Sequence, residues 1–376
     1  MGTITIDHTG SGSNITLSSD GTSLLLGGSA IGGGGGLDLV KENYGGSSTL
    51  PNVTGTDAVG IGERSVVAGT SSTAIGNSYA GGSGYNHAIH IGSNGSSYGA
   101  TGIMSLAAAG LAKATANYSV AMSYGAHANG QYAFAIGNNA FASSTGAVAL
   151  GASRATGSNS FAAAIGNSAS SYGALASGAI ALGSQARVQS NNGVAIGYGA
   201  RVLSGKNYGV ALGARSNCNA KGQFVHGTGS LVSEGYAQTG MIVIHGRTAN
   251  NTQGTLTSDS SLQSLGTAGS DNQLIVPSYG AIAFDGMIVA RGQGSASDTN
   301  CAAWKVQGLL RRESAASTTT LVSSTVTAID NSPSWGLALA ADTTNGALSV
   351  LVTGSASAPV KWVCTLRSSE TIYNSY

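Results

Sequence analysis

The charged side chains are the residues best suited to chemistry in this chain, and they are unevenly distributed. Only 31 of its 376 residues are charged, 16 basic and 15 acidic. The segment from Arg64 to Ser233 contains no Asp or Glu, and its basic residues are Arg64, Lys113, Arg154, Arg187, Arg201, Lys206, Arg215 and Lys221. A surface with one sign of charge attracts ligands of the opposite sign. We therefore expect this segment to attract acidic polymers.

Carboxylates suited to glycan hydrolysis are missing from this segment. Such hydrolysis requires two carboxylates at a defined separation. The acids that remain as candidates after the segment are Asp259, Asp271, Asp285, Asp298, Glu313, Asp330 and Asp342. Because they are scattered among expected loops, we interpret them as solvated residues and predict that the chain is not an enzyme.

We predict no cofactor and no metal site. His87 and His90 are three residues apart, so in a strand they would point to opposite faces. Cys218, Cys301 and Cys364 have no metal-binding spacing, and three cysteines cannot all pair within one chain. The basic residues are too sparse for a nucleic-acid footprint, and no apolar run has the length of a membrane-spanning helix. We therefore expect neither nucleic-acid binding nor membrane insertion.

A repeat of about 15 residues must position the basic side chains. Its core is a small residue, an aliphatic residue and Gly, as in Ala74-Ile75-Gly76 or Ala164-Ile165-Gly166, and ten copies align, one of them degenerate. Successive copies lie 14 to 17 residues apart, except for one interval of 31 between Gly92 and Ser123. That interval predicts an eroded copy between them. Regular repetition of this kind indicates a solenoid, whose units bury their apolar faces only by stacking on one another.

Each copy has the alternation of a β-strand, in which residues two apart share a face. The Gly that follows allows the backbone to turn, and a second short strand, such as Ala140–Ala142 or Ala200–Val202, completes the unit. Two strands within 15 residues leave no room for a crossover helix. The fold class that we predict is therefore all-β, with a parallel β-roll over residues 59–227.

These repeats resemble the YadA-like head repeats of trimeric autotransporter adhesins. The resemblance is carried by strings such as Ala135-Ile-Gly-Asn-Asn-Ala-Phe-Ala142 and Ala181-Leu-Gly-Ser-Gln-Ala-Arg-Val188. It implies a parallel β-roll and a homotrimer. Such adhesins carry a secretion signal and a C-terminal membrane anchor, and we find neither pattern here. Bacteriophage tail fibres and head fibres reuse the repeat, so we expect a phage fibre protein, assembled in the host cytoplasm and located in the virion.

The N-terminal residues 1–31 contain short strand-like runs and are followed by a Gly-rich linker and lead-in over residues 32–58. We predict that residues 1–31 attach the chain to other phage tail or head proteins through the apolar residues Ile4, Ile6, Ile15 and Leu17. A frayed cap of the β-roll is the alternative interpretation.

The C-terminal residues 228–376 contain all three tryptophans and several short strand-like runs separated by turn residues. This pattern is typical of an antiparallel β-sandwich. We expect it to form the tip of a trimer, with Trp304 and Trp335 contacting a receptor.

The sequence thus predicts a homotrimeric phage fibre that binds host polysaccharide or lipopolysaccharide. The residues expected to bind receptor on the shaft are Arg187, Arg201, Lys206, Arg215 and Lys221. Two alternatives stay open: a capsid head fibre or decoration protein without receptor specificity, and a tailspike glycan hydrolase with its site in the C-terminal domain.

Overall fold

The computed structural model describes the backbone of four N-terminal strands within residues 3–30, and then residues 51–62, 64–81, 87–92, 98–166, 170–229, 235, 237–260, 263–293, 300–331 and 333–373. The described residues are all-β, apart from one short 3-10 turn at Ala316–Thr318. This agrees with the predicted fold class. The chain forms two compact units, Met1–Asn139 and Ala140–Tyr376.

The first unit begins with four short antiparallel strands, paired in chain order: β1 (Thr3–Ile6), β2 (Ile15–Ser19), β3 (Leu24–Leu26) and β4 (Ser29–Ala30). The candidate attachment residues Ile4 and Ile6 lie opposite Leu17 and Ile15 in the register of β1 and β2. The Gly-rich run at residues 32–36 lies outside the described residues.

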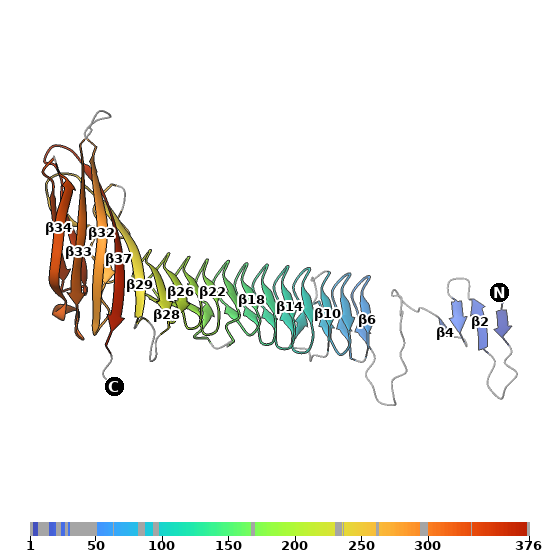
Figure 1. Cartoon of the computed structure of the whole chain (residues 1–376). Helices are drawn as coiled ribbons and strands as arrows, with labels where there is room; N and C mark the ends of the chain where they lie inside the picture. Colours follow the sequence, from blue (N-terminus) through green and yellow to red (C-terminus); the bar gives the residue numbers. More distant parts are fainter. Residues whose placement is uncertain are drawn as a thin grey trace. The chain divides into compact units, whose positions relative to one another are not determined.

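The rest of the first unit is a β-solenoid of six coils, each with one two-residue and one three-residue strand (Figure 1). The two-residue strands are β5 (Asn52–Val53), β7 (Val66–Val67), β9 (Tyr79–Ala80), β11 (Gly99–Ala100), β13 (Lys113–Ala114) and β15 (His127–Ala128). The three-residue strands are β6 (Val59–Ile61), β8 (Thr73–Ile75), β10 (Ile89–Ile91), β12 (Leu106–Ala108), β14 (Val120–Met122) and β16 (Phe134–Ile136). β12 confirms the eroded copy, and the first coil begins earlier than expected, at Asn52.

The second unit starts with six further coils (Figure 1), and in the last two of them the longer strand has five residues in place of three. One sheet comprises β17 (Phe141–Ala142), β19 (Arg154–Ala155), β21 (Gly173–Ala174), β23 (Arg187–Val188), β25 (Arg201–Val202) and β27 (Asn217–Cys218). The other comprises β18 (Val148–Leu150), β20 (Phe161–Ala163), β22 (Ile180–Leu182), β24 (Val194–Ile196), β26 (Val210–Ala214) and β28 (Phe224–Thr228).

Alanine fills most of the solenoid interior. The central residues of consecutive three-residue strands stack in register, as Ala107, Ala121 and Ala135 do, and all three are fully buried. His90 takes this central position in β10 and is also fully buried. Its Nδ1 accepts a hydrogen bond from the backbone N–H of Tyr79 at 3.0 Å. The small side chains let the two sheets of a coil approach closely.

The residue that ends a repeat has a left-handed backbone and is usually Gly, as at Gly151 (φ 69°) and Gly183 (φ 108°). Ala164 takes this place in the coil between them, with φ 55°. The repeat that we aligned on Ala164-Ile165-Gly166 is therefore misplaced by two residues, because the strand is Phe161–Ala163 and Ile165 lies fully buried in the interior.

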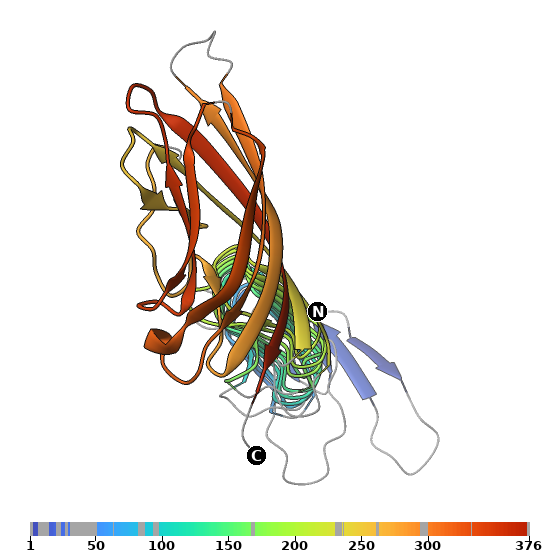
Figure 2. The same cartoon turned by 60° about the vertical axis from the view of Figure 1, so that its left-hand side comes forward.

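The C-terminal part of the second unit is built on a sheet of long antiparallel strands (Figure 2). Its strands are β29 (Ala237–Thr248), β32 (Gly280–Gly292), β33 (Cys301–Arg311), β34 (Thr320–Asp330) and β37 (Val360–Ile372). The strand β32 is continuous through two apolar runs, Ala281–Phe284 and Met287–Ala290. Gly286 between them is required by close packing, since a Cβ there would collide with the carbonyl oxygen of Thr365.

A smaller sheet packs on the long one and encloses a bulky core. It comprises β30 (Gly254–Thr255), β31 (Leu274–Ile275), β35 (Gly336–Asp342) and β36 (Ala347–Thr353). Trp304 and Trp362 stack with ring centroids 5.6 Å apart, and Trp335 is tilted against Trp362 at 5.9 Å. The indole N–H of Trp362 donates to Thr248 Oγ1. These contacts define a β-sandwich with an aromatic core.

A buried carboxylate ties the last coil to the long sheet. Glu370 of β37 accepts hydrogen bonds from Gln223 Nε2, Gln238 Nε2 and Ser368 Oγ, and it is only 5 % exposed. Burial raises the pKa of Glu370. Gln238 also bonds the backbone of Asn217 in β27. This polar network lies at the last coil, where the stack of buried alanines ends.

Candidate functional site

Three arginines of the second unit project from the same face of the solenoid. Arg154, Arg187 and Arg201 are the first residues of β19, β23 and β25, and the second residue of each strand is fully buried. The arginines therefore point outward. Arg187 lies directly opposite Arg201 in the parallel register. We call Arg154, Arg187 and Arg201 the arginine row.

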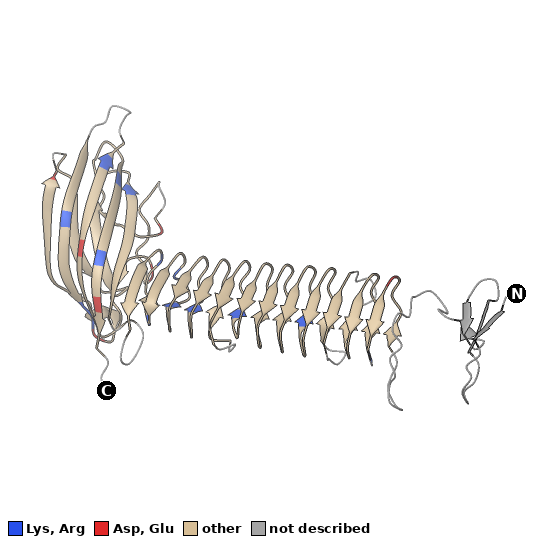
Figure 3. Ribbon diagram, turned by 45° about the vertical axis from the view of Figure 1, so that its right-hand side comes forward, with Lys and Arg blue, Asp and Glu red and all other residues tan. Residues whose placement is uncertain are grey.

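The arginine row has no acidic residue in its own coils, because Asp and Glu are absent from residues 64–233. Figure 3 shows blue positions on the short strands of the solenoid and red positions mainly in the C-terminal part. The guanidinium of Arg154 lies over the ring of Phe141, 4.1 Å from its centroid. Like charges in neighbouring coils repel one another, and a bound polyanion would relieve that repulsion.

The other predicted basic residues lie apart from this row. The Lys221 ammonium forms ion pairs with Asp259 at 2.8 Å and Asp271 at 3.3 Å, and the hydrogen bond to Asp259 raises the pKa of Lys221. Lys206 Nζ donates to the carbonyl oxygen of Ser270, and burial lowers the pKa of Lys206. The two lysines therefore fasten Asp259, Ser270 and Asp271 to the solenoid. They do not form the open basic band that we expected.

Arg215, Trp304 and Trp335, which we also expected to bind receptor, contact other side chains of the protein. The guanidinium of Arg215 lies 5.6 Å from the centroid of the Tyr198 ring. Trp304 is 3 % exposed and Trp335 is 6 % exposed. The receptor contacts expected of these tryptophans require exposed rings, and the structure instead places both in the sandwich core, where their large apolar area is most stabilising.

The described residues contain no group of three or more His, Cys, Asp or Glu side chains arranged to hold a metal ion. Cys218 and Cys364 are buried and Cys301 is exposed, and all three are free thiols. Burial raises the pKa of Cys218 to about 12. No helix among the described residues has the length and apolarity needed to cross a bilayer.

The fold defines the class of protein: a parallel β-solenoid with an interior of small residues, followed by an antiparallel β-sandwich. Three segments of the chain match the family model of the YadA head domain repeat, at residues 54–78, 128–153 and 174–200. These three segments of the solenoid are thus similar to the YadA head repeat. No curated protein matches the chain by sequence.

Two solved structures of phage tailspikes are similar to this chain. One is the tailspike gp49 of Acinetobacter baumannii bacteriophage Fri1, a capsular polysaccharide depolymerase, with 9 % identity, a TM-score of 0.22, and coverage of 89 % of this chain and 49 % of that one. The other is the tailspike of Acinetobacter baumannii phage AM24, with 11 % identity, a TM-score of 0.18, and coverage of 87 % and 58 %. The chain therefore spans about half the length of these tailspikes.

This comparison corrects one prediction. We expected the chain not to be an enzyme, and the finding that contradicts this is that gp49 is a depolymerase. The low TM-scores identify no catalytic residue in this chain. The three head-repeat matches agree with the resemblance on which the expectation of a phage fibre rests.

Proposed function

We propose that this chain is a bacteriophage fibre that assembles as a homotrimer and binds acidic polysaccharide on the host surface through the arginine row. The observation that carries the binding function is the outward projection of Arg154, Arg187 and Arg201 from one sheet of the solenoid, within residues 64–233, which contain no Asp or Glu. Polysaccharides with regularly spaced carboxylates or phosphates suit such a row, because guanidinium groups bind these anions well.

The other face of the solenoid supports assembly. In each unit the outward residues of the three-residue strands are almost all apolar. Examples in the first unit are Ile89, Ile91, Phe134 and Ile136, which are 42 %, 45 %, 41 % and 39 % exposed, and Ile196 in the second unit is 40 % exposed. Monomers rarely expose so long an apolar surface. We call this surface the apolar ladder.

The partner that fits the apolar ladder best is a second copy of this chain. The ladder repeats once per coil, so only a partner with the same rise meets an apolar residue at every step. A parallel copy has that rise by construction. Copies that each contact the next through the same rotation form a closed ring when that rotation is a whole fraction of a turn. The adhesin resemblance favours a ring of three copies. A trimer also presents three arginine rows, which increases avidity.

The proposed polysaccharide binding is tested by removing charge from the row. The double variant Arg187→Gln/Arg201→Gln should bind immobilised polygalacturonate at least about tenfold more weakly than the wild type. Added salt should weaken binding of the wild type, since exposed charges are screened. The matched control is Lys305→Gln/Lys361→Gln, which removes the same charge from the C-terminal sheet. Equal binding by both double variants would overturn the proposal.

Assembly is tested by sedimentation. The wild type should sediment as a trimer, and Ile136→Asp/Ile196→Asp should shift it toward monomers because it places charges in the ladder. A wild type that sediments as a monomer would refute the homotrimer. Oligosaccharides released during incubation with the polymer would instead indicate the tailspike hydrolase alternative.

A further inference from the structure

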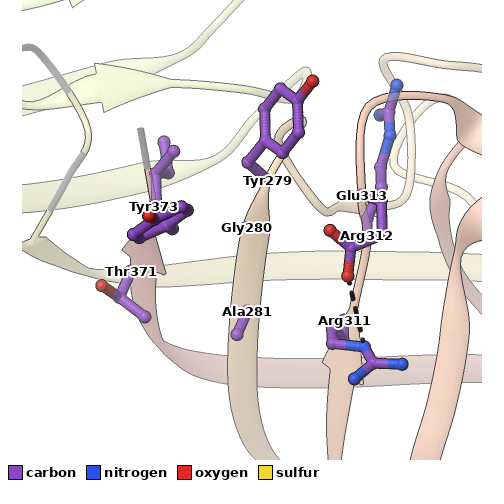
Figure 4. Close-up of a pocket in the computed structure, with 9 residues that line it drawn as sticks. Tyr279, Gly280, Ala281, Arg311, Arg312, Glu313, Thr371 and Tyr373 are labelled. Atoms are coloured by element: carbon purple, nitrogen blue, oxygen red, sulfur yellow. Dashed lines mark ion pairs between the residues drawn. The ribbon is translucent and has the colours of Figure 1, made fainter. Parts of the chain in front are cut away.

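A cavity of about 360 Å³ lies at one end of the long C-terminal sheet, where three chain segments meet (Figure 4). The segments are Tyr279–Ala281 at the start of β32, Arg311–Glu313 at the end of β33, and Thr371–Tyr373 at the end of β37. The cavity is separate from the arginine row, and the sequence did not single it out.

Main-chain hydrogen bonds hold the three segments together. The N–H of Tyr279 donates to the carbonyl oxygen of Glu313 at 3.1 Å, and the N–H of Tyr373 donates to the carbonyl oxygen of Tyr279 at 2.8 Å. The N–H of Arg312 donates to the carbonyl oxygen of Gly280 at 2.9 Å. The side chains at the cavity therefore project from a fixed frame, which reduces the entropy lost when a ligand binds.

Tyr279 has an unusual backbone for a large residue. Its φ is 57°, and among the described residues from 237 onward only Ser334 is another non-glycine residue with positive φ. Such strain persists where the surrounding structure imposes it, often at ligand sites. Here the hydrogen bonds to Glu313 and Tyr373 impose it, and they leave the Tyr279 side chain 48 % exposed.

The side chains around the cavity combine apolar rings with charges. In the view of Figure 4 the ring of Tyr279 lies between Tyr373 and the ion pair of Arg311 with Glu313. Tyr373 is 70 % exposed, and the Arg311 Nε to Glu313 Oε1 distance is 3.7 Å. Arg312 points elsewhere, since its Nη1 donates to the carbonyl oxygen of Val276. Arg311 is thus the arginine placed to meet a ligand.

We propose that this cavity is a second carbohydrate site, which binds one or two units of an acidic polysaccharide. The apolar face of a sugar ring stacks on Tyr279 and Tyr373, which also offer hydroxyl groups. The carboxylate of Glu313 accepts hydrogen bonds from sugar hydroxyls, and Arg311 binds the acidic group of the ligand. The ligand class rests on the proposed function, but the residues are different.

The experiment uses the assembled wild-type protein and two soluble probes, trigalacturonate as an acidic trisaccharide and maltotriose as a neutral one. Titration calorimetry should detect trigalacturonate binding that Tyr279→Ala and Arg311→Gln each weaken about fivefold to tenfold. Tyr279→Phe should retain most of the binding because the ring remains. Tyr208→Ala is the matched control, since Tyr208 is 66 % exposed, has φ 62° and lies in the solenoid.

The outcomes separate this site from the arginine row. Arg187→Gln/Arg201→Gln should bind the polymer at least about tenfold more weakly and should keep trigalacturonate binding in the cavity. If Tyr279→Ala and Arg311→Gln bind trigalacturonate as the wild type does, the cavity proposal fails while the arginine row stands. Maltotriose binding of equal strength would overturn the preference for an acidic sugar. Unchanged tryptophan fluorescence in the variants would exclude misfolding as the cause of lost binding.

Discussion

The solenoid and the C-terminal sandwich solve the same problem with different side chains. The solenoid buries stacked alanines such as Ala121 and Ala135, whereas the sandwich buries Trp304, Trp335 and Trp362 in one cluster. Each coil buries little apolar area and is stable only beside its neighbours. The sandwich concentrates a large apolar area in a few residues. We therefore expect mutations to destabilise the solenoid mainly where they disturb its backbone conformation, and the sandwich mainly where they remove buried side-chain volume.

The largest effect is expected in the sandwich. Trp362→Ala should lower its unfolding free energy by about 3–5 kcal/mol, because it opens a cavity in a packed core. It also leaves Thr248 Oγ1 without the indole N–H. Denaturant unfolding followed by tryptophan fluorescence reports on this region alone, since all three tryptophans lie there. Trp362→Phe should retain much of the stability, and an Ala variant as stable as the wild type would contradict the comparison.

The next effect distinguishes the two regions by pH. Burial lowers the pKa of His90 from 6.5 to about 4. Between these two pH values the imidazole is therefore protonated in the unfolded chain and neutral in the folded one. The stability of the first unit should therefore fall as pH drops below about 6.5 and level off below about 4, a loss of about 3 kcal/mol. Protonation of Nδ1 would also remove its hydrogen bond from Tyr79.

The sandwich should respond in the opposite direction. Burial raises the pKa of Glu370 above its ordinary value, so its ionisation destabilises the fold and acid relieves that effect. Amide hydrogen exchange at pH 7 and pH 4 resolves the two regions. His90→Ala, which restores the residue found at this position in neighbouring coils, should reduce the acid sensitivity of the first unit, and the remainder is expected from His127, whose pKa is also lowered by burial. An unchanged acid response in that variant would assign the sensitivity to another group.

A smaller effect is expected where the solenoid requires glycine. Gly197 has φ 128°, and a Cβ there would collide with the carbonyl oxygen of Gly213 in the next coil. Gly197→Ala should destabilise the coils around β24 by about 1–3 kcal/mol. Hydrogen exchange of the β24 and β26 amides measures the change, and Ser184→Ala in an exposed turn of the solenoid serves as the control. Protection equal to the wild type would show that the backbone adjusts freely.

The smallest effect runs in the opposite sense. Ala164 occupies a position that is glycine in the flanking coils and has φ 55°. Ala164→Gly should stabilise the solenoid by up to about 1 kcal/mol, because glycine adopts this backbone without strain. Ala163→Gly, one residue earlier within β20, should destabilise it. Hydrogen exchange at β20 and β22 measures the stability change of each variant. A change of the same sign in both would refute the explanation by backbone conformation.

The regularity of the solenoid made it predictable from sequence. The interval of 31 residues located the eroded coil at β12, because stacking requires a strand at every step. The position of the Phe161–Ala163 strand was missed because Ala164-Ile165-Gly166 resembles the motif but lies two residues too late. A left-handed alanine cannot be distinguished from an ordinary one by residue type alone.

The site was less predictable because it depends on contacts distant in sequence. Arg187 and Arg201 are one repeat apart, and they take the same position in successive coils. The ion pairs of Lys221 with Asp259 and Asp271 join a coil to a loop some 38 to 50 residues later, and no local pattern indicates them. The same holds for the cavity around Tyr279, whose three segments become neighbours only through the pairing of β32 with β33 and β37.

The in-register stacking of similar coils has a consequence for how such a chain can evolve. Duplicating or deleting a segment of one repeat would add or remove one step without altering the surfaces of the others. The length of the solenoid and the number of its arginine-bearing coils can therefore change by recombination within a gene. The segments before and after the solenoid keep their roles.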